Sequence, residues 1–425
     1  MNMRILLISV NRSREIMPCM PVGVACLCSL LSDHDVKVMD LFWEENPEEA
    51  IRTAVRETQP GLIGLSIRNI DNQLWSRTEY YLPAVKRYIE AIREETAMPV
   101  VLGGAGYSVF PYDALEYLGA DWGIAGDGEI SFPSFIRAME SCKDPSSITG
   151  VIKRGAIGAR FAPPRVSDYD KVPLPAFDVI RLEDYRKLNG SLSILARRGC
   201  PFNCIYCDAP VSEGHKIHGK IPKRLVDEIE AAYHEGVTAF NIADNVFSHP
   251  KGYARAVAEE IIARKIKIAW GATLHPRGIK EEDVRLLRHA GFVFASVTPD
   301  SGSPEMMKRL KKGCTLDEVI KLTQLLKETG IRFFLSFLLG GPGESKSTVD
   351  ESIKLALNTK ADLTTMRVGM RITPMTHLHK LAISDGVIDP QDKLIEPRFY
   401  TNNVTDWIFE HLRTSLSGLQ SLIIQ

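Results

Sequence analysis

The stretch RRGCPFNCIYC, residues Arg197 to Cys207, decides how the whole chain is interpreted. It places three of the eight cysteines, Cys200, Cys204 and Cys207, at C-x3-C-x2-C spacing. Such a group is compatible with a structural zinc site, with part of a disulfide framework, or with the ligands of an iron–sulfur cluster. The surrounding sequence distinguishes among these three possibilities.

The composition is that of a globular protein without a strong charge. Of 425 residues, 44% are hydrophobic and 25% are charged, and the formal net charge is −1. This balance gives no indication of a nucleic-acid partner or an anionic membrane surface. The first residues lack a secretory cleavage site, and no run of roughly 18 apolar residues occurs, so we expect a cytoplasmic chain without a membrane span. Because cytoplasmic thiols stay reduced, a disulfide framework is disfavoured.

The first 142 residues alternate apolar runs with amphipathic segments. Strands are expected at ILLISV, VKVMDL, LIGLSI, PVVLGG and WGIAG, with helices between them. Apolar strands separated by helices predict an α/β, Rossmann-like parallel sheet. Ligands of such sheets bind beyond the carboxyl ends of the strands. The candidate binding loops are therefore SIRNIDN (66–72), GGAGYS (103–108) and GDGE (126–129).

A second alternation of strands and helices follows a linker. Residues 143–190 are rich in proline and charge, which predicts an ordered linker. From 191 to 375, successive strand–helix units predict a partial (β/α)6 barrel of the TIM type, whose functional face lies at the carboxyl ends of the strands. The three cysteines come directly after the first of these strands. Residues 376–425 are expected to form a small helical cap.

The barrel context favours a cluster over zinc. A structural zinc ion needs four ligands. His215 or His218 offers a fourth ligand, but no second C-x2-C and no H-x3-H occurs in the chain. Three thiolates on one loop leave one metal position open, which suits a [4Fe–4S] cluster with a substrate-accessible iron.

The cysteine motif and its surroundings resemble the radical S-adenosylmethionine (SAM) superfamily. The resemblance implies that the three cysteines hold a [4Fe–4S] cluster, that its fourth iron binds SAM, and that the backbone of Tyr206 contacts the adenine. It also implies an external one-electron reductant such as flavodoxin or ferredoxin, which reduces the cluster so that SAM is cleaved to a 5′-deoxyadenosyl radical. The motifs NIADNVF, TPDSGS and GPGE imply further SAM-binding residues: Asp244, Asn245, Asp300, Gly341 and Gly343.

The N-terminal domain resembles the cobalamin-binding domain of one branch of this superfamily. No G-x-G-x-x-G follows the first strand, as a dinucleotide site would require. No Asp-x-His-x-x-Gly occurs either, so no protein histidine is expected on the cobalt. Arg68 is placed to face the lower side of the corrin, where a cation would disfavour Co(III), although pairing with Asp71 is an equal alternative. The residues implied for cobalamin are Pro21, Ser66, Arg68, Asn69, Gly103, Gly104, Tyr107, Gly126, Gly128 and Glu129.

The resemblance implies a cobalamin-dependent radical SAM methyltransferase. It would methylate an unactivated carbon of a small molecule or peptide by means of methylcobalamin and the deoxyadenosyl radical. Three alternatives stay open: the same cofactors used for cyclisation, ring contraction or oxidation; methyl transfer without a deoxyadenosyl radical; and a non-catalytic iron–sulfur or zinc protein. No catalytic acid or base can be chosen from the sequence.

Overall fold

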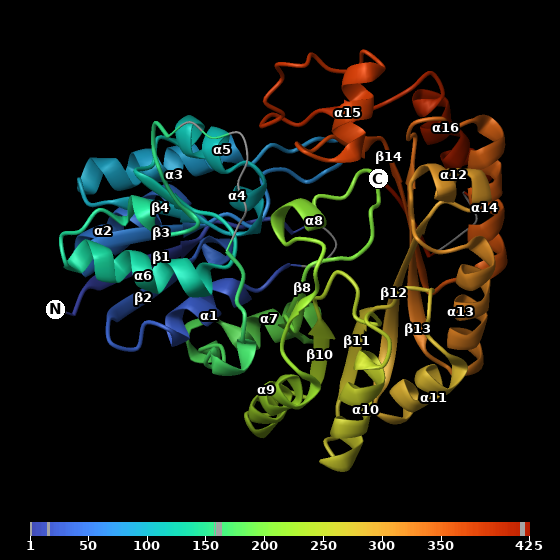
Figure 1. The fold of residues 1–425 in the computed structure, drawn as a ribbon, viewed down its shortest axis with the longest axis horizontal. Coiled ribbons are helices and arrows are strands. Elements are labelled where there is room, and N and C mark those ends of the chain that lie inside the picture. The colour runs from blue at the N-terminus through green and yellow to red at the C-terminus, as the bar shows by residue number, and fades with distance from the viewer. Residues whose placement is uncertain (1, 15–17, 157, 159–163, 417–420) are drawn as a thin grey trace. The chain divides into compact units, whose positions relative to one another are not determined.

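The computed structural model describes residues 2–14, 18–156, 158, 164–416 and 421–425 and divides into two compact units. Unit 1 comprises Met1–Asn72 and Tyr80–Leu192, and unit 2 comprises Gln73–Glu79 and Ser193–Gln425. Each unit is built on a largely parallel sheet covered by helices (Figure 1). The predicted α/β class is therefore confirmed.

The sheet of unit 1 has the order β2-β1-β3-β4-β5-β6. Its first five strands pair in parallel, and each coincides with one of the predicted apolar runs. An order of 2-1-3-4-5 is a doubly wound topology whose switch point lies between β1 and β3. The strands are β1 (Arg4–Ser9), β2 (Asp35–Asp40), β3 (Leu62–Ser66), β4 (Val100–Gly103) and β5 (Trp122–Ile124).

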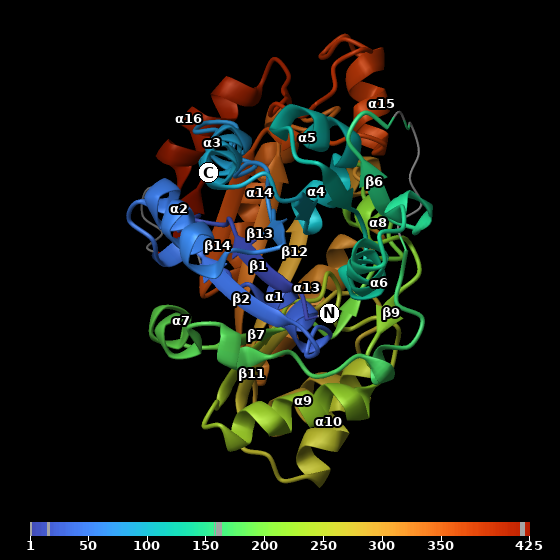
Figure 2. The same ribbon diagram turned by 90° about the vertical axis from the view of Figure 1, so that its left-hand side faces the viewer.

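Helices cover both faces of this sheet. On one face, α1 (Val22–Ser29) and α6 (Gly128–Glu140) pack on strand residues in a core that includes Leu7, Val101 and Phe132. Three other helices cover the opposite face (Figures 1 and 2). They are amphipathic, and each buries one apolar stripe; they are α2 (Pro47–Thr58), α3 (Leu82–Glu95) and α5 (Pro111–Leu118).

The stretch 143–190, expected to be a linker, lies within unit 1 and contains regular structure. β6 (Val151–Lys153) pairs antiparallel with β5. Near the end of the stretch, α7 (Leu182–Asn189) buries Tyr185, whose hydroxyl donates a hydrogen bond to the Asp40 carboxylate at the end of β2 (2.7 Å). A three-residue edge strand gives too short a periodic signal to stand out in a proline-rich stretch. Residues 157 and 159–163 of the expected linker are outside the described residues.

The sheet of unit 2 has the order β17-β14-β13-β12-β11-β10-β7, and its strands from β10 to β17 pair in parallel. Six of the strands match the six predicted units: β7 (Leu192–Ile194), β10 (Ala239–Ile242), β11 (Ala269–Thr273), β12 (Phe292–Asp300), β13 (Arg332–Leu339) and β14 (Leu363–Val368). The helices that follow them lie along the outer face of the sheet (Figure 1): α9 (Pro222–His234), α10 (Tyr253–Ala263), α11 (Glu281–His289), α13 (Leu316–Glu328) and α14 (Lys346–Thr359). The sheet begins at β7 and ends at β17, and these two strands do not pair with each other. The barrel is therefore open, and the predicted partial barrel is confirmed.

Residues 376–425, expected to be a helical cap, also add a seventh strand to the barrel sheet. α15 (His377–Ser384) and α16 (Thr405–Ser415) are helices, as expected. β17 (Leu422–Ile424), however, pairs in parallel with β14, and the backbone N–H of Gln425 donates to the carbonyl oxygen of Met366 (2.9 Å). The apolar run that forms β17 is too short to be distinguished from the end of a helix by its pattern. Residues 417–420 are outside the described residues.

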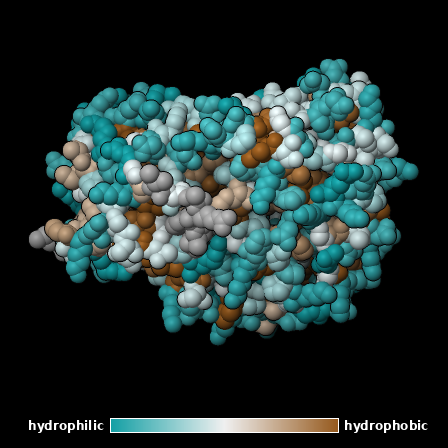
Figure 3. Space-filling model, turned by 45° about the horizontal axis from the view of Figure 1, so that its top comes forward, coloured by the Kyte–Doolittle hydropathy of each residue, from teal (hydrophilic) through white to brown (hydrophobic). Residues whose placement is uncertain are grey.

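The surface carries no sign of a membrane-spanning segment. No described helix combines the length and the apolar character that crossing a membrane requires. The face shown in Figure 3 is mostly hydrophilic, and its hydrophobic side chains gather in small groups.

Candidate functional site

The cysteine loop begins after β8 (Arg197–Arg198) and ends at Cys207. Gly199 turns the chain with φ 87°, and a Cβ at this position would lie 2.5 Å from the carbonyl oxygen of Lys216. Only glycine therefore fits the start of the loop. The backbone N–H of Cys200 donates to the carbonyl oxygen of Gly214 (3.0 Å), and that of Cys207 donates to the carbonyl oxygen of Cys204 (3.2 Å). These bonds hold the backbone at both ends of the loop.

A buried ion pair fixes the strand from which this loop leaves. Asp244, just after β10, accepts hydrogen bonds from the backbone N–H groups of Ala196 (3.0 Å) and Arg197 (2.9 Å) and from Nε of Arg197 (3.1 Å). The Arg197 guanidinium also donates to the carbonyl oxygen of His249 (2.7 Å) and lies 3.5 Å from the centre of the Tyr253 ring. Burial raises the pKa of Asp244, while the Arg197 charge and the N–H donors oppose that rise.

Asp244 and Asn245, both predicted to contact SAM, also have partners within the protein. Asp244 was predicted to contact SAM, but its carboxylate is taken up by the backbone of the preceding strand and by Arg197. The side-chain amide of Asn245 donates to Glu213 (2.5 Å), which also accepts from the backbone N–H of Gly199 (2.8 Å). These contacts join both residues to the start of the cysteine loop, and their contact with SAM stays a prediction.

Phe202, inside the cysteine loop, contacts His275 and Gly313. Its ring stacks on the ring of His275, which follows β11, with centroids 3.8 Å apart and an interplanar angle of 10°. A Cβ on Gly313 would approach the Phe202 ring to 2.6 Å, so the chain after α12 (Pro304–Arg309) packs tightly against it. Burial lowers the pKa of His275 to about 4, so this ring is neutral near pH 7.

Three polar side chains meet beside the third cysteine. The Tyr206 hydroxyl contacts the Asp300 carboxylate, and Nζ of Lys312 lies 2.7 Å from Oδ2 of Asp300 and 3.4 Å from the Tyr206 hydroxyl. Burial acts to lower the pKa of Lys312, but the interaction with the Asp300 carboxylate outweighs it and raises the pKa. The structure thus gives the predicted residue Asp300 a buried cationic partner. Sequence reasoning missed Lys312, because a single lysine in the run KRLKKG carries no distinguishing signal.

A cavity of about 270 Å³ lies next to these side chains. It brings together Tyr206, Cys207 and Asp300 of the predicted site. Arg367 and Arg371 from β14 and β15 (Met370–Arg371) also line it, and neither was predicted. Guanidinium groups beside a carboxylate suit a ligand that carries both charges, such as the methionyl end of SAM.

The predicted glycine turn lies between β13 and α14. A Cβ on Gly341 would approach Cε of Met370 to 2.5 Å, so close packing already accounts for this glycine. The buried Glu344 contacts the Thr348 hydroxyl and accepts a hydrogen bond from the backbone N–H of Gly340 (3.3 Å). Neither Gly341 nor Gly343 lines the cavity beside Tyr206, and their contact with SAM stays a prediction.

In unit 1, most of the predicted cobalamin-binding residues gather at the carboxyl edge of the sheet. The loops after β3, β4 and β5 are joined by hydrogen bonds from the N–H of Ile67 to the carbonyl oxygen of Gly103 (2.7 Å) and from the N–H of Gly126 to Oγ of Ser108 (3.0 Å). Gly104 has φ 102°, and a Cβ there would lie 2.5 Å from the carbonyl oxygen of Ile67. The residues that end strands, lie in these loops or begin the helices at this edge are Pro21, Ser66, Arg68, Asn69, Gly103, Gly104, Gly126, Gly128 and Glu129.

Tyr107, which was also predicted to bind cobalamin, lies in the core of unit 1. Its side chain is completely buried, and a Cβ on Gly123 of β5 would lie 2.3 Å from its Cζ atom. The ring therefore packs against the sheet, where Gly123 leaves room for it. The side chain of Tyr107 is part of the core, and a contact of this residue with cobalamin stays a prediction.

The side chain of Arg68 is exposed at this edge. The Asn69 amide is oriented so that its nitrogen and its oxygen both have a partner. In this orientation the amide oxygen accepts a hydrogen bond from Nη1 of Arg68 (3.1 Å). His34 is the only histidine among the first 192 residues, and it precedes β2 at the amino edge. The loops at the carboxyl edge thus offer no imidazole to a cobalt ion.

The cysteines are not arranged around a single ion. Among the described residues, no three His, Cys, Asp or Glu side chains converge as they would around one metal ion. This does not support a mononuclear zinc site at the loop. In a [4Fe–4S] cluster each cysteine binds a different iron, so convergence on one point is not required.

Comparison with known families identifies both units. The sequence model of the radical SAM superfamily matches residues 194–356, and that of the B12 binding domain matches residues 17–136. The chain is a cobalamin-binding radical SAM protein. The resemblance noted in the sequence is thereby confirmed, together with the predicted cofactors: a [4Fe–4S] cluster, SAM and cobalamin.

Relatives of this cobalamin-binding radical SAM protein include named methyltransferases. An uncharacterized methyltransferase of Pyrococcus horikoshii is 24% identical over 374 residues, which are 87% of this chain and 79% of the relative. A tryptophan 2-C-methyltransferase of Streptomyces laurentii is 25% identical over 439 residues, 87% of this chain and 73% of the relative. The solved structure of a radical SAM methyltransferase from Kitasatospora setae, with cobalamin and a [4Fe–4S] cluster bound, shares the fold with a TM-score of 0.81 at 24% identity, over 91% of this chain and 75% of that one.

The stacking of Phe202 on His275 generates a prediction about pH. The pKa of His275 in the folded chain, about 4, lies below its ordinary value of 6.5, so the unfolded chain binds more protons between these values. Stability therefore falls as the pH drops through this window. Between pH 7 and pH 5 we expect the wild type to lose about 2 kcal/mol more unfolding free energy than His275→Phe, which keeps the stack but cannot titrate.

Urea unfolding of the cluster-free chain at both pH values measures this difference. The exposed His234→Phe is the control and should show the pH dependence of the wild type. Equal losses for the wild type and His275→Phe would show that burial does not depress the pKa of this ring.

Proposed function

We propose that this protein is a cobalamin-dependent radical SAM enzyme that methylates an unactivated carbon of a small molecule or peptide. The observation that carries the proposal is the presence, on one chain, of a cysteine loop at the functional face of a radical SAM barrel and of a B12-binding domain. Relatives named as methyltransferases, which align with 87% of the chain, support methyl transfer as the outcome.

Cys200, Cys204 and Cys207 are the proposed cluster ligands. Burial is the main cause that raises the pKa of all three thiols, that of Cys207 to about 12. The loop thus keeps protonated thiols until metal ions displace the protons, as expected for metal ligands away from water. When bound, the cluster supplies the electron that cleaves SAM, and cobalamin supplies the methyl group.

The side chains around the cavity have the roles of binding and orientation. We propose that Tyr206 and Asp300 contact SAM there, with Lys312 holding the Asp300 side chain in place through their 2.7 Å ion pair. Arg367 and Arg371 are proposed to attract the carboxylate of SAM or of the substrate. Arg371 is itself fixed by its hydrogen bond to the carbonyl oxygen of Leu394 (2.9 Å), so its charge is held in place before a ligand arrives.

One prediction of the proposed function concerns the cluster ligands. Replacing any of Cys200, Cys204 or Cys207 by alanine should abolish the cluster, because two cysteines on this loop leave two irons without a protein ligand. Iron and sulfide analysis after anaerobic reconstitution, together with the visible absorbance of the cluster, measures the loss. Cys314→Ala is the matched control, since Cys314 is a buried thiol outside the motif. Full cluster content in a loop variant would remove that cysteine from the ligand set.

A second prediction concerns the reaction product. The protein reconstituted with iron, sulfide and hydroxocobalamin is incubated with SAM labelled in its methyl group, a reductant and an extract of the native cell. We expect a product heavier by one labelled methylene unit, together with 5′-deoxyadenosine, detected by mass spectrometry. A product without the label would contradict methyl transfer and indicate cyclisation, ring contraction or oxidation.

Methyl transfer without a deoxyadenosyl radical is the second candidate function. The relative named tryptophan 2-C-methyltransferase favours it, because carbon 2 of an indole is electron-rich and can accept a methyl cation without losing a hydrogen atom first. In the same experiment, a labelled product without 5′-deoxyadenosine would identify this course. The two candidates are therefore separated by one measurement.

A third prediction concerns Arg68, which we propose lies beneath the corrin. A cation near the cobalt opposes the additional positive charge of Co(III) and so favours the reduced states. Arg68→Ala should therefore lower the reduction potential of bound cobalamin and change its visible spectrum. Arg56→Ala, at the far end of α2, is the control. An unchanged spectrum and potential in Arg68→Ala would overturn the role.

A further inference from the structure

We propose that a groove beside the cysteine loop, which we call the basic groove, is the docking surface for an acidic one-electron carrier protein of the flavodoxin or ferredoxin type. The inference rests on the proposed function, because it assumes a cluster at Cys200, Cys204 and Cys207. It goes further by assigning the place where electrons enter.

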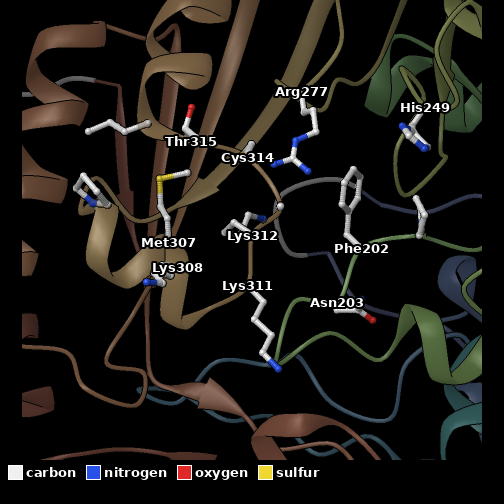
Figure 4. Close-up of a pocket in the computed structure, with 14 residues that line it drawn as sticks. Phe202, Asn203, His249, Arg277, Met307, Lys308, Lys311, Lys312, Cys314 and Thr315 are labelled. Atoms are coloured by element: carbon white, nitrogen blue, oxygen red, sulfur yellow. The ribbon is translucent and has the colours of Figure 1, made fainter.

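The basic groove is larger than the cavity beside Tyr206, with a volume of about 700 Å³. Its lining includes Pro201, Phe202 and Asn203, the three residues between the first two cysteines. The other sides come from α12, from the segment 311–316 and from Arg277 in the loop after β11. Figure 4 shows Phe202, Arg277 and Lys312 around the hollow, with Lys308 and Lys311 extending from its side.

The exposed charges of the basic groove are all positive. Arg277, Lys308 and Lys311 are exposed, and within the described residues none of them forms an ion pair. Of the acidic side chains near the lining, Glu305 pairs with Arg309 (2.8 Å), and Glu318 accepts from the backbone N–H of Thr315 (2.8 Å). Asp317 is exposed next to Leu316 but does not line the groove. Because the whole chain has a net charge of −1, this cationic surface is a local feature.

The surface combines apolar and cationic groups as a protein interface does. Phe202 and Leu316 are half-buried and contribute apolar area, and Arg277, Lys308 and Lys311 are exposed around them. An apolar centre with a charged, solvated rim is typical of protein–protein contacts. Small interfaces of this kind serve transient electron-transfer complexes, in which opposite charges speed the encounter.

The position of the groove fits electron delivery. Asn203 directly precedes the ligand Cys204, and Phe202 is two residues from both Cys200 and Cys204, so a carrier seated there would be next to the cluster. Phe202 is also held rigidly by His275 and Gly313. In the transfer itself, the carrier loses one electron and the cluster gains it, and no bond is made or broken.

The test compares two reductants of the reconstituted enzyme. Cluster reduction is followed by stopped-flow absorbance with reduced flavodoxin and, separately, with dithionite. In Lys308→Glu/Lys311→Glu we expect the second-order rate with flavodoxin to fall at least tenfold at low salt and the rate with dithionite to stay unchanged. The wild-type rate with flavodoxin should fall as salt is added, whereas that of the double variant should change little. Titration calorimetry should show weaker binding of flavodoxin to the double variant.

Lys327→Glu/Lys354→Glu is the matched control. It makes the same change of charge at exposed lysines of α13 and α14 that do not line the groove, and it should behave as the wild type. Equal flavodoxin rates in all three proteins would overturn the docking surface, as would a loss of the dithionite rate in the groove variant. Binding of an RNA oligonucleotide that the groove variant loses would reassign the surface to nucleic acid. Absence of iron and sulfide from the wild type would instead show that the proposed function itself is wrong.

Discussion

The Asp244 carboxylate joins the first two barrel strands at the point where the cysteine loop begins. A carboxylate with no water around it is unfavourable unless charge and hydrogen bonds compensate it. Arg197 and two backbone N–H groups provide that compensation, and the other guanidinium nitrogens bind carbonyl oxygens of the loop after β10. The direction in which the chain enters Gly199, and hence the position of all three cysteines, depends on this pair.

In unit 1, hydrogen bonds likewise fix the loops at the carboxyl edge of the sheet. Its binding-edge loops are joined by hydrogen bonds of their own backbone and of the Ser108 hydroxyl, which donates to the carbonyl oxygen of Gly104 (2.9 Å) and accepts from Gly126. Gly104 leaves no room for a side chain next to Ile67. Loops that are fixed before a ligand arrives lose little conformational entropy on binding a large, flat cofactor. These loops contain no histidine, so they offer the cobalt no imidazole ligand.

Sequence patterns predicted the parts of this protein that follow from periodicity and motif spacing. The two sheets, the place of the cysteine loop and the gathering of Ser66, Gly103 and Gly126 at one edge follow from strand ends in parallel sheets. The tertiary contacts could not be predicted from these patterns. Nothing local shows that Asp244 would turn to Arg197, that Tyr107 would fill the space over Gly123, or that β17 would join the barrel from the last residues. Lys312 is one of several lysines in its run, and only burial distinguishes it.

Lys312 also joins the two hollows on either side of the cysteine loop. Its side chain reaches Asp300 and Tyr206 at the cavity, while its carbonyl oxygen lies 3.4 Å from Nε2 of His275, which stacks on Phe202 in the basic groove. The two halves of the cysteine motif face these two hollows separately. The three residues of the C-x3-C part line the groove, and Tyr206 of the C-x2-C part lines the cavity. A loop built in this way can receive electrons on the side of the groove and bind a ligand on the side of the cavity. A protein carrier then need not enter the cavity, where a radical would have to be kept from water.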